Sequence, residues 1–157
     1  MSGAQQRWFG EALRGRSDGV TGPTRALDRV RRIALTLPGV NERTSHGEPC
    51  FFIRDKRPLC YFHDNHNNDS RISLWCPVPP GVQEEMVSAE PARFFAPPMS
   101  SSGVFSQWLG VYLDTSVPHR IDWGEIAAII EDAFRYIAPA VLVKELDNRT
   151  KPDVTRS

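Results

Sequence analysis

The chain has 157 residues, a length typical of one domain, and 40% of them are hydrophobic, 10% aromatic and 24% charged. This composition excludes a disordered chain, because eight Phe and four Trp side chains need a core to bury them. Nineteen basic and nineteen acidic residues cancel, which excludes binding of nucleic acid by bulk charge alone. The totals predict a soluble α+β globular domain.

Cysteine usage and hydropathy predict a cytoplasmic protein. Cys50, Cys60 and Cys76 form an odd set without a C-x-x-C pair, and each lies in an apolar, strand-like run. A lone cysteine in such a run is typical of a small buried hydrophobe. Because no stretch has the length of a signal peptide or a membrane span, we expect a reducing environment and no membrane contact.

The N-terminal part of the chain is basic and rich in glycine. Residues 1–39 hold seven arginines against three acidic residues, which is typical of a basic arm that contacts an anionic partner. Residues 1–23 carry five of the eleven glycines and few hydrophobic side chains, so we expect a mobile extension. A first helix is predicted from Thr24 to Pro38, with apolar residues at helical spacing.

Three short strands are predicted next, over Pro49–Arg54, Leu59–His63 and Arg71–Pro77. The first two are joined by a tight hairpin at Asp55–Pro58, and the next two by a looser turn at Asp64–Ser70 that is dense in Asn and Asp. Apolar residues lie on both faces of the first strand. This pattern indicates either a strand that is covered on both sides or a strand with one face that is apolar but exposed to solvent.

The second half of the chain alternates helix and strand. A short helix is predicted over Val82–Ala89, an extended piece over Arg93–Pro98, a Ser-rich flexible loop over Met99–Ser106 and a strand over Gln107–Asp114. The strongest pattern follows: Asp122-x-x-Glu125 resembles a capping box before apolar residues at helical intervals.

That last helix is broken at Pro139, and a short further turn is expected to run through Leu146. The predicted domain therefore spans residues 24–146, followed by a polar tail over 147–157. The order α-β-β-β-α-β-β-α is too irregular for stacked βαβ units. It favours a small antiparallel sheet with helices packed against it.

Several motifs resemble those of the MmcQ/YjbR-like proteins, in the same order and over residues 27 to about 146. They are Leu37-Pro38-Gly39-Val40, Thr44-Ser45-His46-Gly47-Glu48-Pro49-Cys50-Phe51, Pro91-x-Arg93-Phe94-Phe95-x-Pro97-Pro98, Trp108-Leu109-Gly110-Val111 and Ala133-Phe134-x-x-Ile137-Ala138-Pro139. The resemblance implies a secretion-chaperone-like or frataxin-like α+β arrangement. It also implies a DNA-binding function through a "double-wing" motif in which the wings are β-hairpins.

Six cations are candidate phosphate contacts, because they share one helix face or crowd the tip of a predicted wing. They are Arg25, Arg29, Arg32, Arg54, Lys56 and Arg57. Guanidinium forks suit phosphate oxygens, since they donate two hydrogen bonds at once. The alternative interpretation is a solvated helix face and an ordinary charged turn.

His46, Gly47 and Glu48 form the turn of the family signature. A histidine near a carboxylate can serve in acid–base catalysis or hold a metal, but no nucleophile stands at a diagnostic spacing. We therefore interpret Gly47 as a positive-φ turn residue and expect His46 to bond the backbone or Glu48.

His63-x-x-His66, with Asp64 and Asp69, is the one cluster that resembles a metal site. Turn chemistry alone accounts for Asp64, Asn67 and Asn68 in this loop, so neither a metal nor another cofactor is predicted. Trp75 and Trp108 could stack on bases, but tryptophans in strands are typical of a core or an interface.

These features give three hypotheses. The first is a non-enzymatic module that binds DNA through the hairpin tip and the first helix. The second is a protein-interaction module that uses the sheet face or apolar loops around Phe94, Phe95 and Phe105. The third is an enzyme that works through His46 and Glu48.

Overall fold

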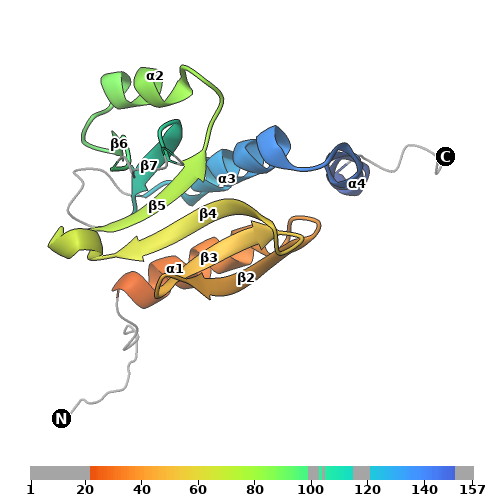
Figure 1. The fold of residues 1–157 in the computed structure, drawn as a ribbon, viewed down its shortest axis with the longest axis horizontal. Coiled ribbons are helices and arrows are strands. Elements are labelled where there is room, and N and C mark those ends of the chain that lie inside the picture. Colours follow the sequence, from red (N-terminus) through yellow and green to blue (C-terminus); the bar gives the residue numbers. More distant parts are fainter. Residues whose placement is uncertain (1–21, 99–102, 104, 115–120, 151–157) are drawn as a thin grey trace, which may run out of the picture.

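The computed structural model describes residues 22–98, 103, 105–114 and 121–150. The predicted α+β class is confirmed, and the predicted elements occur in the predicted order (Figure 1). In chain order the elements are α1 (Gly22–Ala34), β2 (Val40–Ser45), β3 (Glu48–Ile53), β4 (Arg57–Asp64), the 3-10 turn η1 (His66–Asn68), β5 (Ile72–Pro77), α2 (Val82–Ala89), β6 (Phe94–Phe95), β7 (Trp108–Tyr112), α3 (Trp123–Ile137) and α4 (Ala140–Thr150).

The strands form one antiparallel sheet in the order β2-β3-β4-β5-β7-β6. Helix α3 packs on β4 and β5, α1 packs beside α3, and α2 packs on β6 and β7. The main core lies between the sheet and the pair α1 and α3. Its fully buried side chains include Val30, Phe51, Leu59, Leu74, Ile130 and Phe134.

Local signals account for where the two core helices begin. Helix α1 starts at Gly22, slightly before the predicted Thr24, and has Pro23 in its first turn, where a missing N–H costs nothing. At α3, the Asp122 side chain accepts a hydrogen bond of 3.2 Å from the backbone N–H of Glu125, which confirms the predicted cap.

The edge strand β2 was not predicted. Its sequence, VNERTS, does not alternate apolar and polar residues. The strand lies at the edge of the sheet, pairs with β3 alone and has no fully buried side chain, so it needs no apolar face. A contact across 11 residues secures it: the Arg31 guanidinium of α1 donates to both carboxylate oxygens of Glu42, at 2.6 and 2.8 Å. The pairing is therefore supported by tertiary contacts that leave no local pattern.

After Pro139 the chain continues as α4 as far as Thr150, so part of the predicted polar tail is helical. The mobile extension was predicted over residues 1–23, but Gly22 and Pro23 belong to α1, and residues 1–21 lie outside the described residues. Residues 99–102 and 104 of the predicted Ser-rich loop and residues 151–157 of the predicted tail also lie outside them. Among the described helices, none combines the length and apolar character needed to cross a membrane.

Candidate functional site

The β3–β4 loop has three residues, Arg54 to Lys56, and its tight turn is centred on Arg54 and Asp55. Both residues have positive φ, at 51° and 58°, and Lys56 N–H donates to the Ile53 carbonyl at 3.0 Å, a pattern typical of a type I′ turn. The predicted hairpin is thus confirmed, shifted so that Arg57 already belongs to β4. Arg54 N–H donates to the Gly39 carbonyl at 2.7 Å, which ties the turn to the segment after α1.

Residues of strand β2 form hydrogen bonds with Asp55, the only acidic residue in the sequence of this turn. The Asp55 carboxylate accepts a hydrogen bond of 2.8 Å from Arg43, and the Asp55 N–H donates to the Asn41 side chain at 2.8 Å. These contacts turn the carboxylate toward the sheet edge. They offset the strain of two non-glycine residues in the left-handed region.

The three cations of the turn, Arg54, Lys56 and Arg57, are all exposed. Arg57 donates to the carbonyl of Ile137, at the end of α3, at 2.6 Å. Within the described residues no carboxylate lies within 4.0 Å of any of the three. The predicted wing tip is therefore a surface of cations that have no acidic partner in the part of the chain that the structure describes.

The arginines of α1 are spread along the helix. Arg25 and Arg32 lie about 10 Å apart along its axis, at 1.5 Å of rise per residue. The Arg29 guanidinium lies 5.0 Å from the centre of the Trp123 ring, and Arg32 lines a hollow that Glu131 also lines. The β3–β4 turn places its three cations close together, whereas the three arginines of α1 are distributed along the helix.

A hollow of about 400 Å³ opens beside the turn. Arg57 lines it together with Tyr136, Trp108 and Pro77. The Tyr136 side chain is 48% exposed, whereas Trp108 is buried, as expected for a strand tryptophan. Arg57 and an exposed aromatic ring thus share one shallow depression.

The His46-Gly47 turn joins β2 and β3, with φ values of 54° and 81° that confirm the positive-φ role of Gly47. His46 is exposed on this turn. Of the two partners expected for His46, the backbone or Glu48, the Glu48 carboxylate is engaged by another histidine: its Oε2 lies 2.6 Å from Nδ1 of His63, on β4. The short spacing between His46 and Glu48 in the sequence cannot reveal this partner, because only the pairing of β3 with β4 brings His63 next to Glu48.

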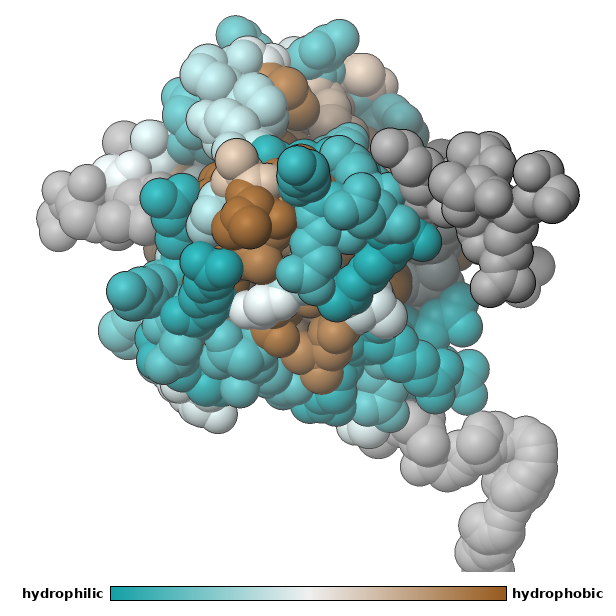
Figure 2. All heavy atoms as spheres, turned by 90° about the vertical axis from the view of Figure 1, so that its right-hand side faces the viewer, coloured by the Kyte–Doolittle hydropathy of each residue, from teal (hydrophilic) through white to brown (hydrophobic). Residues whose placement is uncertain are grey.

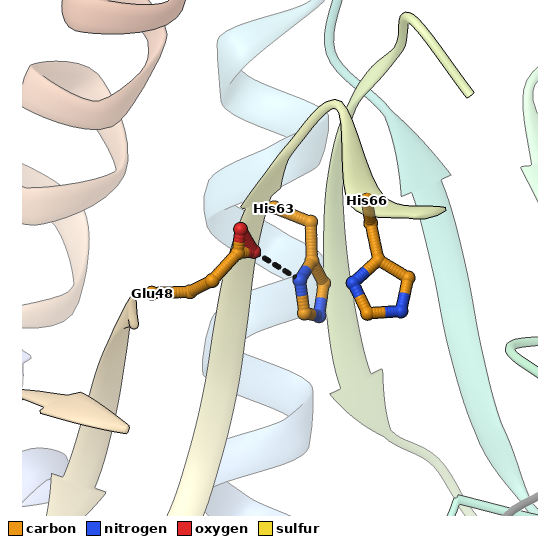
Figure 3. A group of neighbouring side chains, drawn as sticks. All are labelled: Glu48, His63 and His66. Atoms are coloured by element: carbon orange, nitrogen blue, oxygen red, sulfur yellow. Dashed lines mark hydrogen bonds and ion pairs between the residues drawn. The ribbon is translucent and has the colours of Figure 1, made fainter. Parts of the chain in front are cut away.

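Glu48, His63 and His66 form one side-chain cluster on the sheet face away from α1 and α3 (Figure 3). One potential ligand atom from each lies within 4.8 Å of the others. Burial lowers the pKa of His63, although the hydrogen bond to Glu48 partly opposes that shift. The Asp69 carboxylate accepts a hydrogen bond of 2.8 Å from the Arg71 N–H, so it stabilises the turn.

Aromatic rings pack around this cluster. The ring of Trp75 lies 4.0 Å from that of His63 between centroids, and Phe105 packs edge-on against Tyr61, Trp75 and Trp108. Phe94, Phe95 and Phe105, whose apolar loops were considered for a protein interface besides the sheet face, are not fully exposed. Phe94 is buried, and the other two are half-buried against aromatic neighbours.

The three cysteines are buried and have free thiols, as predicted. Burial raises the pKa of Cys50 to about 12 and that of Cys60 well above its ordinary value. Since the thiolate is the nucleophile, Cys50 and Cys60 are not activated for covalent chemistry.

These features define a small α+β domain with one antiparallel sheet, a helical layer on one face and a histidine–carboxylate cluster on the other. The family model YjbR matches residues 35–136, more than half of the chain. The chain therefore belongs to the YjbR family, which confirms the resemblance drawn from its motifs. A search of curated proteins finds no match.

A solved structure shares the fold. The crystal structure of the Deinococcus radiodurans protein DR2400, with a DUF419 domain, matches with a TM-score of 0.57 and 17% identity. The match covers 76% of this chain and 86% of that protein. At this identity the likeness supports the fold alone.

Proposed function

We propose that this YjbR-family chain is a non-enzymatic binding module that contacts nucleic-acid phosphates through the β3–β4 turn. The observation that carries the proposal is the exposure of Arg54, Lys56 and Arg57 without acidic partners among the described residues. Elsewhere arginine is largely neutralised: Arg31 and Arg71 bind carboxylates. In a protein of zero net charge, an unpaired local cluster is what can attract a polyanion.

The neighbouring surfaces support a phosphate contact at this turn. Arg57 shares its hollow with the exposed ring of Tyr136, so a base could stack there while a phosphate meets the guanidinium. Arg25, Arg29 and Arg32 of α1 serve as secondary contacts in this proposal. Buried free thiols support the expected reducing, cytoplasmic setting.

Salt titration tests the proposal. Fluorescence anisotropy with labelled random duplex and single-stranded DNA should show affinity falling as salt rises. Three phosphate contacts predict a log–log slope of about −2.7, or a loss of about 40-fold between about 50 and 200 mM salt. The double variant Arg54→Gln/Lys56→Gln should reduce both the affinity and the slope, because two of the three contacts are lost.

A matched control is Arg93→Gln/Arg135→Gln, which removes the same charge from arginines that already bind carboxylates. This control should retain most of the affinity at each salt concentration. Equal losses in the two double variants would mean that net charge, and not the turn, governs binding. Failure of the wild-type chain to bind either DNA would overturn the proposal.

A specific observation favours a second candidate, a protein-interaction module without a nucleic-acid role. Leu35, Tyr136 and Val141 are large side chains that are 43%, 48% and 60% exposed. Leu35 follows α1, Tyr136 lies near the end of α3 and Val141 near the start of α4. The other end of α4 contacts the segment after α1, where Arg149 donates to the Thr36 carbonyl at 2.8 Å. Figure 2 shows apolar side chains among hydrophilic ones on the face that looks toward the right of Figure 1.

The two candidates respond differently to salt. An apolar interface would hold its affinity as salt rises, whereas phosphate contacts would not. The variant Val141→Ser should lower the affinity for a protein partner and leave the affinity for DNA unchanged. Loss of DNA binding in this variant would place the phosphate contact on α4 instead of the turn.

A further inference from the structure

The sheet face away from α1 and α3 holds a histidine that is almost completely enclosed. His63 is 4% exposed, and its Nδ1 atom lies 2.6 Å from Glu48 Oε2. A carboxylate accepts and does not donate, so Nδ1 carries the proton and Nε2 presents a lone pair. Glu48 thereby fixes both the tautomer and the ring orientation of His63.

That second nitrogen has no hydrogen-bond partner among the described residues, although it is buried. An unsatisfied buried polar atom costs roughly 1–3 kcal/mol, so such atoms are uncommon without a functional reason. The imidazole of His66 lies beside that of His63, with ring centroids 4.4 Å apart (Figure 3). A second nitrogen donor therefore stands next to the unpartnered one.

We propose that His63 and His66, with Glu48 as the positioning carboxylate, bind a late first-row divalent metal ion of the Zn²⁺ class. A histidine that donates one ring N–H to a carboxylate and offers the other nitrogen to a metal is the usual second-shell arrangement at such sites. Imidazole nitrogens suit Zn²⁺ and its neighbours, whereas Mg²⁺ and Ca²⁺ require oxygen ligands. Two protein nitrogens leave coordination positions for water or a further ligand.

The burial of His63 favours the form of its ring that binds a metal. Burial lowers the pKa of His63, so its imidazole is neutral, the form that coordinates a metal. The charged and titratable groups that act on it are Glu48, His66 and Asp69. The inference departs from the sequence prediction of no metal, because Glu48 comes from another strand and the unpartnered nitrogen has no sequence signature.

Metal titration of the untagged full chain tests the site. After treatment with a chelator, equilibrium dialysis against Zn²⁺ should find one ion per chain, and Co²⁺ should give visible absorption bands. His66→Ala should weaken Zn²⁺ binding by at least about tenfold, as expected for loss of a ligand. His66 is only half-buried, so this variant should fold, which its metal-free melting temperature checks.

The matched control is His46→Ala/His119→Ala, which removes the other two histidines of the chain; His119 lies outside the described residues. This control should bind Zn²⁺ like the wild type. Glu48→Gln keeps an acceptor for His63 but loses the charge. It should lower Zn²⁺ affinity about 10- to 100-fold and alter the Co²⁺ bands.

Two outcomes would overturn the proposal. Unchanged Zn²⁺ affinity in His66→Ala would place the metal elsewhere. The absence of Zn²⁺ binding by the wild type would leave His63 Nε2 and the equally unpartnered Trp75 Nε1 to a buried water molecule, which could donate to the first and accept from the second. Neither outcome bears on the DNA proposal, which depends on the opposite end of β4.

Discussion

The Phe95 ring lies over Gly110, its partner across β6 and β7, so closely that a Cβ atom on Gly110 would stand 2.4 Å from two ring carbons. No side chain fits there unless the ring moves. The ring itself is stacked on Tyr112 at 4.6 Å between centroids, which restricts that movement. Glycine is required at this position by close packing and not by a positive φ.

Gly110→Ala should therefore lower the free energy of unfolding by about 1–3 kcal/mol, the usual cost of overpacking. Urea denaturation measures the change. Phe95→Leu removes the ring atoms that the new methyl would strike, so the double variant should lose less than the sum of the two single variants. Additive losses would show that Phe95 is not the obstacle.

The buried histidine predicts how stability depends on pH. The folded pKa of His63 is below its ordinary 6.5, chiefly because burial disfavours the imidazolium. Below about pH 6.5 the unfolded chain thus binds a proton that the folded chain excludes. The contribution of the neutral His63 to the free energy of unfolding is complete above about pH 6.5 and is lost as the pH falls toward the pKa of His63 in the folded chain. Urea denaturation at about pH 7.5, 6.5 and 5.5 measures the loss.

His63→Asn supplies the control for this pH dependence, since it keeps an N–H for Glu48 but does not titrate. The variant should be less stable than the wild type at neutral pH and should change less between about pH 7.5 and 5.5. An equal slope in both proteins would assign the acid sensitivity to other groups.

Asp114 closes the end of the sheet by accepting three hydrogen bonds from Arg71 and Ile72. Its carboxylate accepts from Arg71 at 2.8 and 3.1 Å and from the N–H of Ile72 at 3.0 Å. Asp114→Ala should cost about 2 kcal/mol, because it leaves partly buried donors without an acceptor. Glu145→Ala, which breaks only an exposed pair with Arg149, should cost less than about 0.5 kcal/mol. Equal losses in thermal denaturation would contradict this distinction.

Sequence patterns alone predicted the class of fold, the order of its elements and the limits of α2, because these depend on signals confined to a few neighbouring residues. The Asp122 cap and the apolar spacing of α3 are such signals. Strand β2 has no apolar alternation and escaped prediction for that reason.

The candidate sites divide in the same way. The cations of the β3–β4 turn could be identified from the sequence, because a hairpin tip keeps neighbours in sequence close together in space. Asp55 is held by Arg43, which leaves those cations without an acidic partner among the residues that the structure describes, and this contact required the pairing of β2 with β3. The partner of Glu48 lies 15 residues away across the sheet, and only tertiary structure could select His63 over the nearer His46, since strand register and burial decide which side chains meet.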